Sequence, residues 1–175
     1  DIITSICNKK DTLGLMPTGG GKSITFQVPA LLMEGTCIVI TPLIALMKDQ
    51  VQNLRKKSIT AVAIHSGMSR QEVISTLDNC ILGDIKLLYV SPERLSSDFF
   101  KKKLRHIEVS FITVDEAHCI SQWGYDFRPS YLNIAEIRQL IPNTPILALT
   151  ATAPQLVIKD IQKQLHFKEE NVFKM

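Results

Sequence analysis

The stretch 114–128 combines two kinds of residue that can do chemistry. Asp115 and Glu116 stand side by side at the end of an apolar run, and a loop with three aromatic residues follows at once. Paired carboxylates supply the oxygen ligands that a hard cation such as Mg²⁺ prefers, and aromatic rings can stack on nucleic-acid bases. The stretch therefore indicates metal–nucleotide chemistry beside a nucleic-acid contact.

A glycine-rich segment nearer the start of the chain predicts a phosphate-binding loop. It consists of Met16, Pro17, Thr18, Gly19, Gly20, Gly21, Lys22 and Ser23. This run matches the pattern G-x-x-x-x-G-K-[ST], except that Met16 replaces the first glycine. Glycines let backbone N–H groups curl around an anion, and a helix that begins near Lys22 directs its positive end at the phosphates. The alternative, a glycine-rich turn with a chance Lys-Ser pair, is disfavoured by the strand pattern before the run and the helix pattern after it.

The two clusters predict separate roles for the adjacent acids. Lys22 is expected to reach the β- and γ-phosphates, and Ser23 and Asp115 to hold Mg²⁺. Glu116 can orient or deprotonate the attacking water. His118 is a metal ligand, a general base or a connector, and we favour a connector because no second His or Cys follows at ligand spacing.

The aromatic residues of the loop have two interpretations. Trp123, Phe127 and Arg128 can offer stacking faces and a cation to single-stranded bases, at ~1–3 kcal/mol per stacked base. The alternative is that the aromatic rings pack into the core, as most aromatic side chains do. Gly124 and Pro129 favour an irregular loop over a buried helix.

Hydroxyl residues follow three other apolar runs. Thr150 and Thr152 can bond the acid pair and relay the state of the nucleotide, or they can cap the helix that follows. Thr41 with Pro42, and likewise Ser91, can present a hydroxyl and helix N-terminal N–H groups to a nucleic-acid phosphate.

The elements that must position these residues alternate along the chain. Strands are predicted at 12–16, 37–41, 61–65, 86–90, 111–115 and 146–150, and helices at 22–33, 43–57, 69–82, 98–106, 130–141 and 154–165. This alternation predicts one α/β domain, with a mostly parallel sheet covered by helices on both faces. Because ligands bind at the carboxyl ends of the strands in such sheets, the phosphate loop, the acids and the hydroxyl residues should meet there.

Composition sets wider limits. The chain has 175 residues and a net charge of +3, which is too mild to argue for nucleic acid by itself. Its four cysteines are far apart in sequence, so no zinc knuckle or redox pair is visible and a reducing setting fits best. No apolar run approaches the ~20 residues of a membrane span. The chain lacks an initiator Met, and we expect it to be a piece of a larger protein.

Taken in order, these segments resemble the helicase motifs of superfamily two. The phosphate loop resembles motif I, and motifs Ia, Ib, II and III are matched by 41–50, 91–95, 115–118 and 149–153. The stretch 115–129 is similar to the RecQ family of DNA helicases in particular. The resemblance covers the whole chain, as a first RecA-like domain, and Met16 agrees with this family.

The resemblance implies roles for individual residues. Lys22, Ser23 and Asp115 would bind the phosphates and Mg²⁺ of ATP, and Glu116 would be the catalytic base. The residues that would couple single-stranded DNA binding to ATP hydrolysis are His118, Gln122, Trp123, Phe127 and Arg128, assisted by Thr41, Pro42, Ser91, Thr150 and Thr152.

The resemblance also implies a larger enzyme. It would be a monomeric ATP-dependent 3′→5′ helicase that acts on single-stranded and partly duplex DNA in repair and recombination, without a membrane, in the nucleoid of a bacterial cytoplasm or in a eukaryotic nucleus. A second RecA-like domain with an arginine finger, zinc-binding and winged-helix parts, and an upstream glutamine that reads adenine would lie outside the chain. Because an arginine finger contributes ~10³–10⁵ in rate, the chain alone should bind nucleotide weakly and hydrolyse it poorly.

Three other functions remain open. An RNA helicase of the DEAH type fits Asp115–His118, although the residues after His118 favour RecQ. An adaptor that uses ATP only as a gate would not need intact Lys22, Asp115 and Glu116. A small-molecule P-loop kinase gives no reason for the aromatic loop.

Overall fold

Seven parallel strands form one sheet in the order β3-β4-β2-β5-β6-β1-β7. The computed structural model describes residues 1–175. The strands are β1 (Thr12–Leu15), β2 (Thr36–Ile40), β3 (Ala61–Ile64), β4 (Leu87–Val90), β5 (Val109–Val114), β6 (Ile146–Thr150) and β7 (Val172–Lys174). The predicted α/β class and all six predicted strands are confirmed, and every strand pair is parallel. The short edge strand β7 was not predicted.

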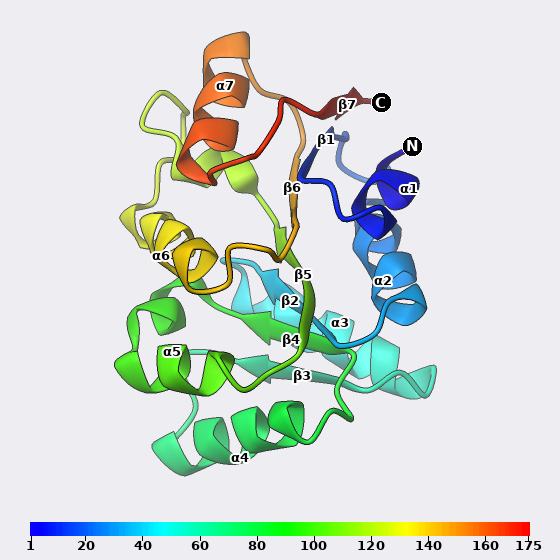
Figure 1. Cartoon of the computed structure of the whole chain (residues 1–175), viewed down its shortest axis with the longest axis vertical. Coiled ribbons are helices and arrows are strands. Elements are labelled where there is room, and N and C mark those ends of the chain that lie inside the picture. Colours follow the sequence, from blue (N-terminus) through cyan, green and yellow to red (C-terminus); the bar gives the residue numbers. More distant parts are fainter.

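Helices cover both faces of the sheet (Figure 1). They are α1 (Ile2–Cys7), α2 (Lys22–Leu32), α3 (Ile44–Lys56), α4 (Arg70–Ile81), α5 (Asp98–Leu104), α6 (Asn133–Leu140) and α7 (Gln155–Gln164). Three short 3₁₀ helices connect them: η1 (Pro92–Ser96), η2 (Ala117–Ile120) and η3 (Pro129–Leu132). Buried residues of α1, α2 and α3 share one core cluster, and those of α4, α5, α6 and α7 share the other. No helix is both long enough and apolar enough to cross a bilayer.

The strands supply both clusters because successive side chains point to opposite faces. In β2, Ile38 and Ile40 belong to the cluster beneath α4 to α7, whereas Cys37 and Val39 belong to the one beneath α1 to α3. All five residues of β2 are buried, as expected for a strand covered on both faces.

The strand order brings the chemical segments together at the carboxyl edge of the sheet. β5 lies between β2 and β6, and β6 pairs with β1. The acid pair after β5 is therefore flanked by Thr41 after β2 and Thr150 at the end of β6. The phosphate loop after β1 lies one strand further along.

A buried ion pair links elements at the amino edge of the sheet, opposite the edge at which the chemical segments meet. The Arg138 guanidinium of α6 donates to both carboxylate oxygens of Asp11, at 2.9 and 2.8 Å. Asp11 also accepts from the backbone N–H groups of Ile146, at the start of β6, and of Lys168, at 2.9 and 3.0 Å. Asp11 and Arg138 are each only 4% exposed. The pair therefore ties the amino ends of β1 and β6 to α6.

Loss of one partner of this pair should destabilise the chain strongly. In Arg138→Met, the Asp11 carboxylate stays buried without its counter-charge, and we expect the free energy of unfolding in urea to fall by ~3–5 kcal/mol. The exposed pair Lys10–Glu169, at 3.6 Å, gives a matched control. Glu169→Gln should change stability by about 1 kcal/mol or less. Equal losses in the two variants would show that the buried pair does not hold this edge.

Candidate functional site

The phosphate loop has the backbone shape that anion binding needs. Gly19 and Gly21 have φ angles of +81° and +79°, a region that strains residues with a side chain. Gly21 directly precedes α2, which begins at Lys22. Residues 17–21 are exposed, and the Met16 N–H donates to the Thr150 carbonyl at 2.9 Å, which anchors the loop to β6. The open loop and the helix N-terminus together can bind a phosphate.

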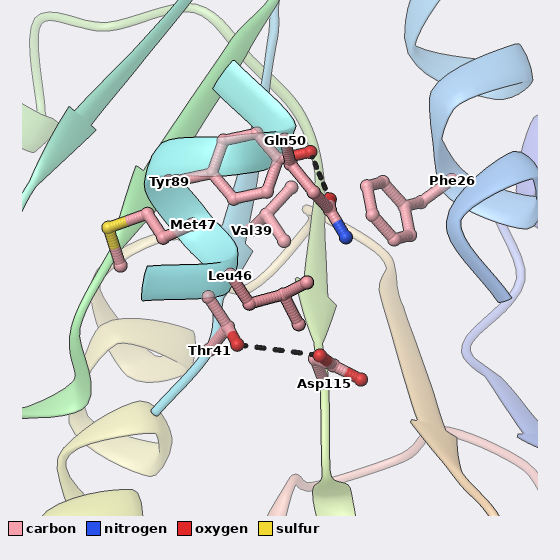
Figure 2. Close-up of a pocket in the computed structure, with 8 residues that line it drawn as sticks. All are labelled: Phe26, Val39, Thr41, Leu46, Met47, Gln50, Tyr89 and Asp115. Atoms are coloured by element: carbon pink, nitrogen blue, oxygen red, sulfur yellow. Dashed lines mark hydrogen bonds between the residues drawn. The ribbon is translucent and has the colours of Figure 1, made fainter. Parts of the chain in front are cut away.

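The acid pair faces this loop. Lys22 Nζ lies 3.8 Å from Glu116 Oε1, with both side chains largely shielded from solvent. Asp115 accepts from the Glu116 N–H at 3.0 Å and from the Thr41 hydroxyl at 3.4 Å (Figure 2). Tyr131 donates to the Asp115 carbonyl at 2.8 Å. The predicted meeting of phosphate loop and acids therefore exists in the fold.

Glu116 has a strained backbone. Its φ and ψ angles are 50° and 45°, the left-handed region that few non-glycine residues adopt. Such a conformation costs on the order of 1 kcal/mol and persists only where the surroundings impose it. At this residue the chain turns away from the direction of β5, and the 3₁₀ helix η2 begins at the next residue.

The site is electrostatically prepared for a cation. Burial raises the pKa of Asp115, and the charge of Glu116 raises it further, while Lys22 opposes both effects. A second positive charge would stabilise the ionised carboxylate. Ser23 offers a hydroxyl oxygen and Asp115 a carboxylate, the hard donors that suit Mg²⁺. The residues present therefore fit this ion.

A hollow of about 430 Å³ adjoins the phosphate loop and has the size of a small-ligand pocket. It can receive the base and sugar of a nucleotide whose phosphates lie on the loop. Its lining comes from the loop, α1, α2 and β7: Asp1, Ile2, Ile3, Met16, Gly20, Gly21, Ile24, Thr25, Phe173, Lys174 and Met175.

His118 connects the acids to β6 and to the aromatic loop. Its Nδ1 lies 2.8 Å from the Thr150 hydroxyl and 3.4 Å from Glu116 Oε2. Its buried ring stacks on Tyr125, with centroids 4.8 Å apart. The sequence predicted that Thr150 could bond the acid pair directly. In the structure, the Thr150 hydroxyl instead contacts His118, which in turn contacts Glu116. Thr152 is exposed and has no hydrogen bond, so it neither bonds the acids nor caps α7.

His118, Cys119 and Asp126 also lie close enough together for a metal site, with ligand atoms within 4.8 Å. Their interactions are already satisfied, however. Asp126 pairs with Arg128 at 3.1 Å and accepts from the Cys119 thiol at 3.7 Å. Burial raises the pKa of that thiol to about 12, which favours the protonated form. These contacts fit a His118 that links the acid pair to β6 and to the aromatic loop, and its role as such a connector stays a prediction.

The aromatic loop is open to solvent. Trp123 and Tyr125 are 67% and 83% exposed, which excludes core packing for these two rings. Gln122 is exposed, and Phe127 and Arg128 are half-buried. The loop can therefore meet a ligand without unfolding.

Helix α7 fixes the base of this loop. The Ser121 hydroxyl donates to Asp160 of α7 at 2.6 Å and accepts from the Trp123 N–H at 3.2 Å. The Arg128 N–H donates to the Cys119 carbonyl at 2.9 Å, which closes the other end. The exposed rings thus stand on an ordered frame.

Two predicted phosphate contacts are not on the surface. Thr41 and Ser91 are each 2% exposed, so their hydroxyls cannot reach a nucleic-acid phosphate in this conformation. Thr41 instead bonds Asp115, and the buried Ser91 hydroxyl has no partner. Pro42 remains partly exposed. Gln50, which donates to Ser23 Oγ at 3.2 Å, ends the segment that resembles motif Ia. No individual role was predicted for it, because a single glutamine in a helix carries no pattern of its own.

The family model and the relatives that match this chain are described as helicases. A family model described as DEAD/DEAH box helicase matches residues 1–161. The chain is 53% identical over 164 residues to "ATP-dependent DNA helicase RecQ" of Bacillus subtilis, covering 93% of the chain and 28% of that protein. It is 43% identical over 173 residues to the protein of the same name in Pasteurella multocida, covering 99% of the chain and 27% of that protein. The chain thus spans about a quarter of the length of these relatives.

Solved structures share the fold at low identity. The Pyrococcus furiosus Hef helicase domain has a TM-score of 0.74 at 19% identity, covering 99% of the chain and 37% of that structure. A hypothetical ATP-dependent RNA helicase from Sulfolobus tokodaii has a TM-score of 0.74 at 20% identity, covering 100% and 51%. The structural likeness therefore extends over the whole chain.

The raised pKa of Asp115 gives a stability prediction. Because the folded chain holds this proton more tightly than the unfolded chain, ionisation opposes folding at about pH 7. Asp115→Asn should therefore raise the free energy of unfolding of the nucleotide-free chain. This gain should shrink as the pH falls through the raised pKa of Asp115 and should vanish below the ordinary carboxyl pKa. Urea titrations across this range measure it.

The exposed Asp49 of α3 provides the control. Asp49→Asn should leave the stability almost unchanged over the same pH range. A loss of stability in Asp115→Asn at neutral pH would mean that the carboxylate is well solvated or paired, and that the site needs no added cation.

Proposed function

Because the chain belongs to the DEAD/DEAH box helicase family, we propose that it is the nucleotide-binding motor domain of an ATP-dependent DNA helicase of the RecQ type. The observation that carries the proposal is the approach of Lys22 to Glu116 at 3.8 Å. This short distance supports roles for Lys22 in binding a phosphate and for Glu116 in activating water. Relatives at 41–53% identity are named DNA helicases, which favours DNA over RNA.

ATP binding would rearrange the charges around Glu116. Lys22 exchanges its contact with Glu116 for the phosphates, because a phosphate carries the larger negative charge. Ser23 and Asp115 would hold Mg²⁺, which when bound would neutralise charge on the phosphates. Glu116 keeps its 3.4 Å contact with His118 and becomes free to orient the attacking water. Each group thus has one role in hydrolysis.

The aromatic loop would report DNA binding to this site. DNA stacked on Trp123 shifts a loop whose Tyr125 lies against the His118 ring, and His118 contacts both Glu116 and Thr150. Only Tyr125 and His118 would therefore separate the aromatic loop from Glu116. The complete enzyme would act as a monomer with 3′→5′ polarity and would use a second RecA-like domain to complete the ATP site.

Lys22→Ala tests nucleotide binding. The variant loses a charge-assisted contact, and we expect the affinity of the 175-residue chain for a fluorescent ATP analogue with Mg²⁺ to fall about 10-fold or more. The exposed Lys159 of α7 supplies the control, since Lys159→Ala removes the same charge from a residue outside the phosphate loop. Equal affinity of Lys22→Ala and the unmodified chain would refute the proposal.

Trp123→Ala tests the coupling role in the complete helicase. Loss of a stacking face should lower the ratio of DNA-stimulated to basal ATP hydrolysis by roughly 5-fold or more. Leu82→Ala is the matched control, because Leu82 is similarly exposed, at 75%, but lies at the end of α4. If DNA stimulation survived in Trp123→Ala, the ring would not be part of the DNA contact.

A further inference from the structure

A partly buried chain of hydrogen bonds runs from the sheet to the phosphate loop. The Tyr89 hydroxyl of β4 donates to Gln50 Oε1 at 2.7 Å. Gln50 Nε2 of α3 then donates to Ser23 Oγ at 3.2 Å. Tyr89 is 1% exposed. Three elements that are distant in sequence therefore meet at the hydroxyl that would bind the metal.

The surroundings of Gln50 hold its amide in place. Its side chain extends between Tyr89 and Phe26 (Figure 2). Phe26, Leu46 and Met47 help to line this pocket, which leaves no room for a water molecule. Within this pocket, solvent therefore cannot replace Tyr89 as the partner of the Gln50 amide oxygen. Ser23 lies outside the pocket, on a groove that Gln50 also lines. Asp115 lines the same pocket as Tyr89, so Gln50 shares a pocket with one of the groups that would bind Mg²⁺ and a hydrogen bond with the other.

The direction of these bonds matters for Ser23. Burial raises the pKa of Tyr89, so the phenol stays neutral and can donate to the amide oxygen of Gln50. The amide N–H groups then face Ser23. A serine oxygen has two lone pairs and one hydrogen. When one lone pair accepts from Gln50, the hydrogen and the second lone pair are confined to the two remaining directions around the oxygen.

We propose that Gln50 is a positioning residue for Mg²⁺, which acts by orienting the Ser23 hydroxyl, and that Tyr89 in turn fixes the amide of Gln50. The inference rests on the proposed nucleotide site. It adds a function for a residue of α3 that touches neither the phosphates nor the metal. Gln50 would set how much Mg²⁺ the site requires and would leave metal-free nucleotide binding unaltered.

Equilibrium binding of a fluorescent ATP analogue to the 175-residue chain tests this role. Gln50→Met keeps the length of the side chain but removes both hydrogen bonds. We expect the Mg²⁺ concentration at half-maximal enhancement of binding to rise about 5- to 10-fold. Affinity measured in EDTA should stay the same. Tyr89→Phe should shift the Mg²⁺ requirement less, and the double variant should behave like Gln50→Met because the two bonds act in series.

Asn53 provides the matched control. It lies one turn further along α3 and lines a groove with Ser23 and Gln50, but makes no hydrogen bond to Ser23. Asn53→Met should bind Mg²⁺ and nucleotide like the unmodified chain. An equal loss of affinity with and without Mg²⁺ in Gln50→Met would overturn the proposal, because it would indicate a merely structural role.

The same experiment separates the two proposals. If the unmodified chain shows no Mg²⁺-dependent nucleotide binding, the proposed function fails and the role of Gln50 fails with it. If the unmodified chain shows such binding and Gln50→Met has the same Mg²⁺ requirement, only the positioning role is overturned.

Discussion

The partly buried carboxylate of Asp115, at the end of β5, is the constraint on which the rest of the site depends. Asp115 is shielded from solvent and repelled by Glu116, so its pKa is raised and its ionised form is costly without a cation. Three neighbouring groups compensate in part. Thr41 and the Glu116 N–H donate to the carboxylate, and Lys22 lies beside the acid pair. A bound Mg²⁺ would supply the charge that these contacts leave unmatched.

The sheet is tied together by buried hydrogen bonds at its amino edge and carries exposed loops at its carboxyl edge, where Asp115 lies. At the amino edge, Asp11 and Arg138 join β1 and β6 to α6 through buried charge-assisted hydrogen bonds. At the carboxyl edge, the phosphate loop and the aromatic loop are exposed, yet each is anchored to β6 or α7 by a few short bonds. His118 lies between them and contacts both the acid pair and Tyr125. Changes at either loop can therefore reach the acids without disturbing the core.

Much of this arrangement follows from sequence, for definite reasons. Buried parallel strands are continuous apolar runs, so six strands and the edge at which the phosphate loop meets the acid pair could be predicted. The strand β7 could not, because Val172–Lys174 is too short to show a pattern. The burial of Thr41 and Ser91 depends on tertiary packing, which a strand-to-turn pattern does not reveal. Gln50 and the left-handed backbone of Glu116 likewise become visible only once separate elements meet.

The central claim is that the phosphate loop and the acid pair form one Mg²⁺–nucleotide site. A crystal structure of the chain with a non-hydrolysable ATP analogue and Mg²⁺ tests it most directly. We predict that the phosphates lie on residues 17–23, that Lys22 has left Glu116, and that Ser23 and Asp115 hold the Mg²⁺. Phosphates bound away from the loop, or Mg²⁺ remote from Asp115, would contradict the account.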